Sequence, residues 1–208
     1  MKIKICGITN VEDADVAVKA GADALGFVMY RKSPRFVKPA VARSIVASLP
    51  PFVVAVGVFV NEEPDRVPAL MDDCGFALAQ LHGDETVLYC QNLGRPVLKA
   101  LRLKDRGTFF ALAEFQGRAN VRGVLIDAFS DQAYGGTGHT VDWTLAQEAA
   151  RSTPIVLAGG LTPANVAEAI TRVRPYGVDV SSGVELSPGK KDHDKVKAFI
   201  AAARLVPA

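Results

Sequence analysis

The sequence alternates short apolar runs with amphipathic stretches eight times along its 208 residues, and this pattern restricts the fold more than any other feature. The run VVAVGVF at residues 53–59 is typical of a strand buried on both faces, as parallel strands covered by helices are. The expected strands are residues 2–6, 23–29, 53–59, 77–81, 97–101, 123–127, 155–157 and 178–181. The expected helices are residues 11–20, 39–49, 64–74, 85–93, 108–116, 142–151, 163–173 and 192–205.

This alternation fits either an open, doubly wound sheet or a closed barrel. The dinucleotide-binding version of the open sheet carries GxGxxG after its first strand, and the sequence has no such motif there. Glycine-rich segments instead follow the seventh and eighth expected strands, where β/α-barrels often hold a phosphate. We therefore predict an α/β protein with a single domain, a (β/α)8 TIM barrel over residues 1–208.

Composition and charge exclude several classes of partner. The formal net charge is +2 with no lysine- or arginine-rich run, so nothing draws the chain to nucleic acid or to an anionic membrane. No apolar run reaches the roughly 18 residues of a membrane span, and the first apolar stretch is too short for a signal peptide. The three widely spaced cysteines, Cys6, Cys74 and Cys90, fit neither a disulfide framework nor a zinc site. We expect a cytoplasmic protein.

In a barrel of this kind the active site lies where the strands end and on the loops that follow. The residues at those positions combine a thiol, a carboxylate, an imidazole, two guanidinium groups and two glycine-rich turns, which is typical of a site for a small anionic substrate. In chain order they are Cys6-Gly7, Ser33-Pro34-Arg35, Asn61, His82-Gly83, Arg102, Asp127, Gly159-Gly160 and Ser181-Ser182-Gly183.

The two glycine-rich turns are candidates for phosphate binding. Gly159 and Gly160 lack a Cβ, so a phosphate can approach their amides closely. Residues 181–185 can form a short helix whose N-terminus faces the ligand, which favours a dianion. A Gly-Gly pair also occurs in plain tight turns. We favour phosphate binding because a closed barrel makes the two loops neighbours.

Strand parity places Cys6 at the barrel mouth. Lys2, Lys4 and Cys6 share one face of the first strand, and the isoleucines at positions 3 and 5 share the other. The isoleucines should face the helices, so Cys6 points inward. Most cysteines in such strands are inert packing residues, so position alone leaves both a catalytic and a packing role open.

Three further strand-end residues have alternative roles. Asp127 follows an apolar run, so it is either a partly desolvated acid with a raised pKa or a group that fixes a loop or caps a helix. Arg35 could bind a carboxylate through two parallel hydrogen bonds or lie solvated on the surface. His82 could contact the substrate or make a structural hydrogen bond.

Two more predictions concern the first and sixth strands. Lys4 and Asp179 lie inside neighbouring strands with inward parity, and a lone buried charge is costly, so we predict an ion pair below Cys6. The loop at residues 128–141 is long for its position and contains GGTG at 135–138, so we predict a lid over the substrate.

These residues resemble the phosphoribosylanthranilate isomerase family of tryptophan biosynthesis over essentially the whole chain. The resemblance is specific because its motifs occur in order, each at a strand end or in the following loop. They are KICGIT at 4–9, GFV at 26–28, SPR at 33–35, VGVF at 56–59, QLHGDE at 80–85, KA at 99–100, GGTG at 135–138, DW at 142–143, LAGGL at 157–161 and GVDVSSGVE at 177–185.

The resemblance implies an isomerase that carries out an Amadori rearrangement. Its substrate would be N-(5′-phosphoribosyl)anthranilate and its product 1-(2-carboxyphenylamino)-1-deoxyribulose 5-phosphate. It further implies that no cofactor or metal takes part, that Asp127 is the general acid and that Cys6 is the general base. The implied substrate-binding residues are Arg35 for the anthranilate carboxylate, His82 as a site histidine, and Gly159, Gly160, Ser182 and Gly183 for the phosphate. Both a monomer and a homodimer are compatible with this reading.

Two other functions are compatible with parts of this sequence. An aldose–ketose isomerase of histidine biosynthesis performs the same rearrangement on a related phosphoribosyl substrate but uses two aspartates, one at the end of the first strand. Cys6 at that position argues against it. A non-catalytic barrel that binds a phosphorylated ligand would keep the glycine turns and Arg35 but would not need both Cys6 and Asp127.

Overall fold

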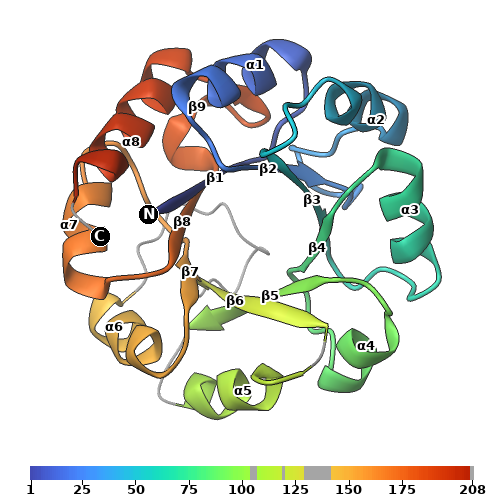
Figure 1. Cartoon of the computed structure of the whole chain (residues 1–208), viewed down its shortest axis with the longest axis vertical. Helices are drawn as coiled ribbons and strands as arrows, with labels where there is room; N and C mark the ends of the chain where they lie inside the picture. The colour runs from blue at the N-terminus through green and yellow to red at the C-terminus, as the bar shows by residue number, and fades with distance from the viewer. Residues whose placement is uncertain (104–106, 119, 129–141, 207–208) are drawn as a thin grey trace.

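The computed structural model describes residues 1–103, 107–118, 120–128 and 142–206. Eight parallel strands pair in chain order and close on themselves, because β1 pairs with both β2 and β8. Figure 1 shows the ring of strands surrounded by helices. The predicted (β/α)8 barrel is therefore confirmed.

The strands of the barrel lie close to their predicted positions. They are β1 (Lys2–Cys6), β2 (Ala24–Val28), β3 (Val54–Phe59), β4 (Leu78–Leu81), β5 (Val97–Leu103), β6 (Val121–Ala128), β7 (Ile155–Leu157) and β8 (Gly177–Val180). The helices are α1 (Val11–Ala20), α2 (Pro39–Ala47), α3 (Arg66–Cys74), α4 (Val87–Asn92), α5 (Gly107–Phe115), α6 (Trp143–Ser152), α7 (Val166–Val173) and α8 (His193–Leu205). Within the described residues no helix is long and apolar enough to cross a membrane.

The starts of α6, α7 and α8 differ from their predicted positions, and at each of them a polar side chain lies just before the first helical residue. Asp142 and Asp192 precede α6 and α8 as N-caps, and each accepts backbone N–H groups of the first turn. The start of α7 moves from residue 163 to Val166. The cause is Asn165, whose side chain accepts the N–H of Thr162 and donates to the carbonyl of Gly160, which holds a turn before the helix.

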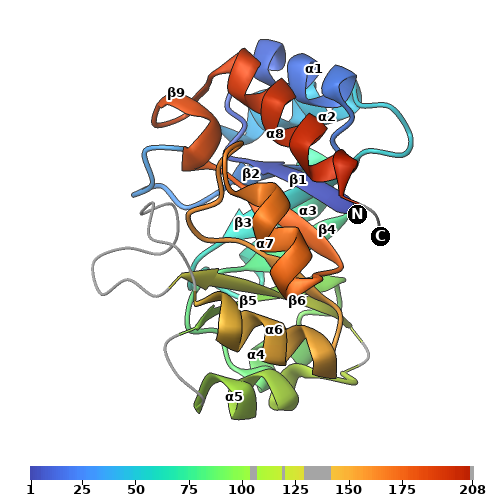
Figure 2. The ribbon, with the colours of Figure 1, turned by 90° about the vertical axis from the view of Figure 1, so that its left-hand side faces the viewer.

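The segment after β8 contains structure that the sequence did not indicate. The predicted short helix is present as a 3-10 turn, η1 (Ser182–Val184). A two-stranded antiparallel hairpin follows it, formed by β9 (Glu185–Ser187) and β10 (Lys190–Lys191). Figure 2 shows β9 at the end of the barrel opposite the N-terminus, which is the end where the strands finish. We call this end the mouth.

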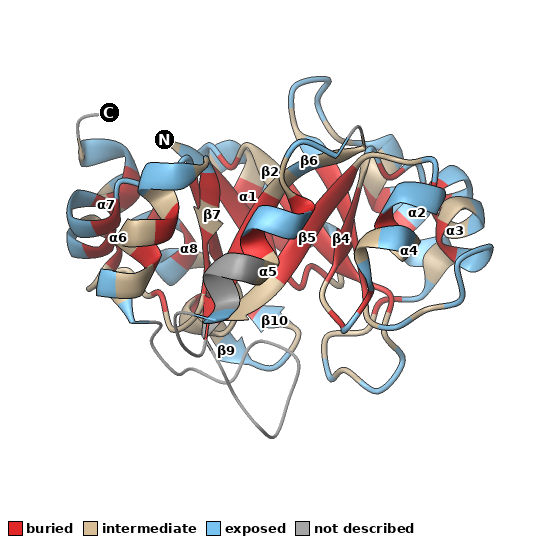
Figure 3. Cartoon of the chain, turned by 90° about the horizontal axis from the view of Figure 1, so that it is seen from below, coloured by how far each residue is buried: buried red, intermediate tan, exposed pale blue. Residues whose placement is uncertain are grey.

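Two apolar layers support the mouth. The first lies between the strands and the helices and includes Ile3 and Ile5, as parity predicted. The second fills the barrel interior and includes a cluster of Leu98, Leu125 and their neighbours. Figure 3 shows the strands buried and the outer faces of the helices exposed. The residues at the strand ends are therefore carried on a rigid frame.

Candidate active site

Cys6 ends β1 at the mouth, as predicted. Its side chain is a buried free thiol that packs in a small cluster with Val28 and Val58. Gly26 pairs with Cys6 across β1 and β2, and a Cβ on Gly26 would lie 2.7 Å from the Cys6 sulfur. Because no real Cβ tolerates that contact, the glycine makes room for the thiol. Burial raises the pKa of Cys6 above its ordinary value, and the charges of Lys4 and Lys191 act against this rise.

Asp127 and His82 meet at the mouth from β6 and from the end of β4. His82 Nε2 lies 3.0 Å from Asp127 Oδ2, and Gln80 Nε2 lies 2.9 Å from His82 Nδ1. With the Gln80 amide nitrogen as donor, Nδ1 is the acceptor, and this tautomer of His82 carries its hydrogen on Nε2, facing Asp127. Asp127 is 5% exposed and Gln80 is fully buried. The carboxyl group of Asp127 is therefore contacted by a histidine that is itself held by a fully buried glutamine.

Arg35 makes a two-point carboxylate contact, but its partner is Glu185 of the same chain. Arg35 Nε lies 2.9 and 3.1 Å from the two oxygens of Glu185, and Nη2 lies 2.7 Å from one of them. Lys191 Nζ reaches the same carboxylate at 2.9 Å. Burial alone would raise the pKa of Glu185, yet these two cations hold it below its ordinary value. The contact joins the loop after β2 to the β9–β10 hairpin.

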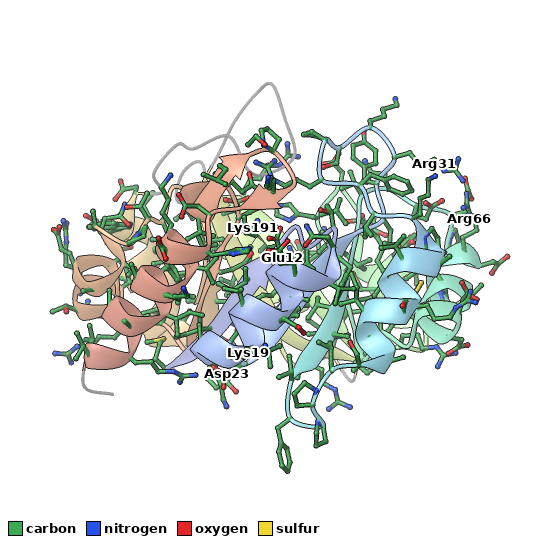
Figure 4. All side chains as sticks on the ribbon, turned by 90° about the horizontal axis from the view of Figure 1, so that it is seen from above. Glu12, Lys19, Asp23, Arg31, Arg66 and Lys191 are labelled. Atoms are coloured by element: carbon green, nitrogen blue, oxygen red, sulfur yellow. The ribbon has the colours of Figure 1, made fainter. Side chains whose placement is uncertain are left out.

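Lys191 and Glu185 are site residues that the sequence reading missed. Lys191 is 1% exposed, and its ammonium also donates to the carbonyl of Ser181 at 3.3 Å. Burial lowers its pKa, against the attraction of Glu185. Figure 4 shows Lys191 near the hairpin end of α1 and Asp23 toward the opposite end of the barrel. The only sequence signals were the Glu at the end of the GVDVSSGVE motif and the pair of lysines after a Pro-Gly turn.

The two glycine-rich loops pack against each other. Gly159 and Gly160 have φ angles of 83° and 64°, a region that favours glycine. Ser182 and Gly183 belong to η1, and a Cβ on Gly183 would overlap the carbonyl oxygen of Leu161. Glycine is thus required where the loop after β8 meets the loop after β7.

The predicted pair of Lys4 and Asp179 is confirmed. Lys4 Nζ lies 2.8 Å from Asp179 Oδ1, and the two side chains are 6% and 8% exposed. The two residues are directly opposite each other in the pairing of β1 with β8. Lys2 lies on the same face of β1 as Lys4, but its side chain is mostly exposed. It pairs with Asp23 at the far end of the barrel.

Other strand-end residues contact the loop after β4. Arg102 Nη2 pairs with Asp84 at 2.6 Å, and the backbone N–H of Asn61 donates to Glu85 at 2.8 Å. Lys99, which is 2% exposed, donates to Glu85 and to the carbonyl of Gly83, both at 2.7 Å. These contacts brace the loop that follows His82. The predicted lid at residues 128–141 lies almost entirely outside the described residues.

A surface hollow lies between the start of α1, the hairpin and the start of α8. Its lining includes Asn10, Asp13, Lys191 and His193. Asp13 accepts the backbone N–H of Lys191 at 2.9 Å and contacts His193 Nε2 at 2.9 Å. These groups satisfy one another, so we interpret the hollow as a structural junction. Among the described residues, no group of three or more histidine, cysteine or acidic side chains is arranged to hold a metal ion.

Comparison with known proteins identifies the family. The family model for N-(5'phosphoribosyl)anthranilate (PRA) isomerase matches residues 3–202. The N-(5'-phosphoribosyl)anthranilate isomerase of Trichlorobacter lovleyi is 54% identical over 205 residues, which cover 98% of each chain. The protein of the same name from Pseudomonas fluorescens is 52% identical over 204 residues, again covering 98% of each.

Solved structures agree with this result. The phosphoribosyl anthranilate isomerase of Thermotoga maritima superimposes with a TM-score of 0.89 at 44% identity, covering 98% of each chain. A phosphoribosyl anthranilate isomerase in complex with reduced 1-(o-carboxyphenylamino)-1-deoxyribulose 5-phosphate gives a TM-score of 0.85 at 44% identity, with the same coverage. The chain therefore belongs to the N-(5'-phosphoribosyl)anthranilate isomerase family, the isomerases of tryptophan biosynthesis.

Proposed function

We propose that this chain converts N-(5'-phosphoribosyl)anthranilate to 1-(2-carboxyphenylamino)-1-deoxyribulose 5-phosphate with Asp127 as general acid and Cys6 as general base. The observation that carries the proposal is that Cys6 and Asp127, both buried, end two strands on different sides of one barrel mouth. A ribose ring placed between them would have one proton donor and one proton acceptor, which an aldose–ketose rearrangement requires.

Asp127 would act first. Its carboxyl group gives a proton to the ring oxygen as the bond from C1′ to that oxygen breaks. The lone pair of the anthranilate nitrogen forms the C=N bond of a Schiff base. His82 would keep the carboxyl group oriented toward the ring oxygen, because its contact with Asp127 restrains rotation of that side chain. The furanose is then open and the C2′ proton has become acidic.

Cys6 would act second. Its thiolate removes the C2′ proton, and the electrons of that C–H bond form the C1′=C2′ bond of an enolamine while the nitrogen becomes neutral. Tautomerisation moves the hydroxyl proton from O2′ and places a proton on C1′, which gives the ketone. Because the thiolate is the reactive form, the site must offset the cost of burying its charge.

Binding would rest on the two charged ends of the substrate. We assign the anthranilate carboxylate to Arg35 and the phosphate to the loops that contain Gly159, Gly160, Ser182 and Gly183. The related isomerase solved with reduced product analogue holds a ligand that carries both groups. Glu185 already occupies Nε and one side of Nη2, so the substrate carboxylate would meet Arg35 at its Nη1 end.

His82 would complete this site as a positioning residue for Asp127. We also propose that the reaction needs no cofactor or metal, because both proton transfers are assigned to side chains of the chain itself. We further propose that the chain is a single domain located in the cytoplasm. Its partner would be a small phosphorylated substrate, with no nucleic acid or membrane partner, and its state would be monomeric or homodimeric. The Thermotoga maritima relative is described as dimeric, with monomers generated from it.

The decisive experiment follows the loss of substrate fluorescence with purified protein. The wild-type chain should turn over the substrate, whereas Cys6→Ala and Asp127→Ala should each lose about 10²-fold or more in kcat. Cys74→Ala, a buried cysteine on α3, serves as the matched control and should retain activity. Wild-type turnover in either site variant would refute the role assigned to that residue.

A further inference from the structure

The thiol of Cys6 and the end of the Lys4 side chain occupy the same small space. Both residues lie on the inward face of β1, two positions apart. A Cβ on Gly26 would lie 2.7 Å from the Cys6 sulfur and 3.0 Å from Lys4 Cε. The space that a side chain at Gly26 would fill is therefore taken by the Cys6 sulfur and by Cε of Lys4, the last methylene before the ammonium group.

The ammonium group of Lys4 is held there by Asp179. The two groups form a 2.8 Å ion pair that is almost fully buried, where solvent screens charges weakly. Burial acts to lower the pKa of Lys4, but attraction by Asp179 and Cys6 is stronger and raises it above its ordinary value. Lys4 therefore carries a positive charge at neutral pH.

Among the residues that the structure describes, four charged groups face the region around Cys6. They are Lys4 from β1, Asp179 from β8, Lys191 from β10 and Arg35, whose Cδ lies against Gly7. Burial has the largest effect on the pKa of Cys6 and raises it. Lys4 exerts the largest opposing effect, Asp179 raises the pKa again to a lesser extent, and Lys191 lowers it.

We infer that Lys4 is a positioning residue for Cys6, which orients the thiol and stabilises its thiolate, while Asp179 holds Lys4 in place. This inference rests on the proposed function, in which Cys6 is the base. Lys4 acts through Cys6 and lies below it, on the side away from the mouth. Its contribution is the local positive charge that a buried thiolate needs.

The test measures the thiol itself. The rate at which iodoacetamide alkylates Cys6 is followed against pH, using mass spectrometry of the peptide that contains Cys6, so that Cys74 and Cys90 do not interfere. Lys4→Met should move the midpoint of this curve upward by about one pH unit or more, and Asp179→Asn should move it downward. Lys2→Met removes a lysine of the same strand at the far end of the barrel and should leave the midpoint unchanged.

The double variant Lys4→Met/Asp179→Asn removes both charges and avoids an unpaired buried ion. Its midpoint should lie between those of the wild type and Lys4→Met, because the attraction of Lys4 for the thiolate exceeds the repulsion by Asp179. If Lys4→Met does not fold, Asp179→Asn and the double variant still test whether Lys4 stabilises the thiolate. The acid limb of kcat/KM should shift in the same direction as the alkylation midpoint.

An unchanged or lowered midpoint in the Lys4→Met or double variant would overturn the inference, and so would an upward shift in Asp179→Asn. This outcome is separate from failure of the proposed function. Alkylation reports on the thiol whether or not it is the base, whereas the role of Cys6 as base is lost only if Cys6→Ala keeps wild-type turnover.

Discussion

His82 Nε2 lies 3.0 Å from Asp127 Oδ2, and this contact links the end of β4 to β6. Gln80, which is fully buried in β4 two residues before His82, contacts the imidazole at its other ring nitrogen. Asp127 is therefore one member of a chain of three side chains, and its direction depends on the other two.

Replacing His82 by Gln should lower kcat by about 10- to 10²-fold with a smaller change in KM, because a misplaced acid costs rate more than binding. His193→Gln is the matched control, since His193 also contacts an aspartate, Asp13, at 2.9 Å but belongs to α8 rather than to the His82–Asp127 pair. Steady-state kinetics of both variants check this. Equal losses in the two variants would show that the effect is a general one on folding.

Replacing Glu185 by Gln should raise KM by about tenfold and change kcat less, because Arg35 loses the charged hydrogen bonds that orient it toward the substrate. Glu168→Gln is the control, since Glu168 pairs with Arg172 on an exposed face of α7. A fall in kcat at unchanged KM would contradict the orienting role.

The carboxylate of Glu185 should make the free energy of unfolding depend on pH in the acid range. The pKa of Glu185 is lower in the folded protein than its ordinary value of 4.5. Its stabilising contribution is therefore fully present above pH 4.5 and is lost as the pH falls through the lower, folded value. Urea unfolding between pH 6 and pH 3 should show a decline below about 4.5 that is shallower in Glu185→Gln. Parallel declines in both proteins would assign the acid sensitivity to other groups.

Replacing Gly183 by Ala should weaken phosphate binding, because the added Cβ would overlap the Leu161 carbonyl and separate the two glycine-rich loops. Inorganic phosphate as a competitive inhibitor measures this directly, and its inhibition constant should rise. Gly123→Ala is the control, since a Cβ there would make only an ordinary 3.5 Å contact with Leu98. Unchanged inhibition by phosphate in Gly183→Ala would remove this loop from the phosphate site.

The sequence predicted the barrel and much of its mouth because both depend on periodic patterns. Parity along β1 was enough to place Cys6 inward and to pair Lys4 with Asp179, since a buried charge in one strand needs a partner in the next. The ends of the strands likewise located Asp127 and His82.

What the sequence could not supply depends on how loops fold in three dimensions. The β9–β10 hairpin has strands of three and two residues, too short for an alternating pattern, so Lys191 and its contact with Glu185 were missed. Arg35 was expected to be either a ligand for a carboxylate of the substrate or a surface residue. Its pairing with Glu185, 150 residues away in sequence, follows only from closure of the barrel. The lid at residues 128–141 stays a prediction.

The roles of acid and base separate most sharply in a kinetic isotope experiment with substrate deuterated at C2′. In Cys6→Ser, removal of the C2′ hydrogen should become rate-limiting, and turnover of the deuterated substrate should slow well beyond the wild-type effect. In Asp127→Asn, ring opening should limit the rate and the isotope effect should fall toward unity. A large isotope effect in Asp127→Asn together with none in Cys6→Ser would contradict the assignment of Cys6 as the base and Asp127 as the acid.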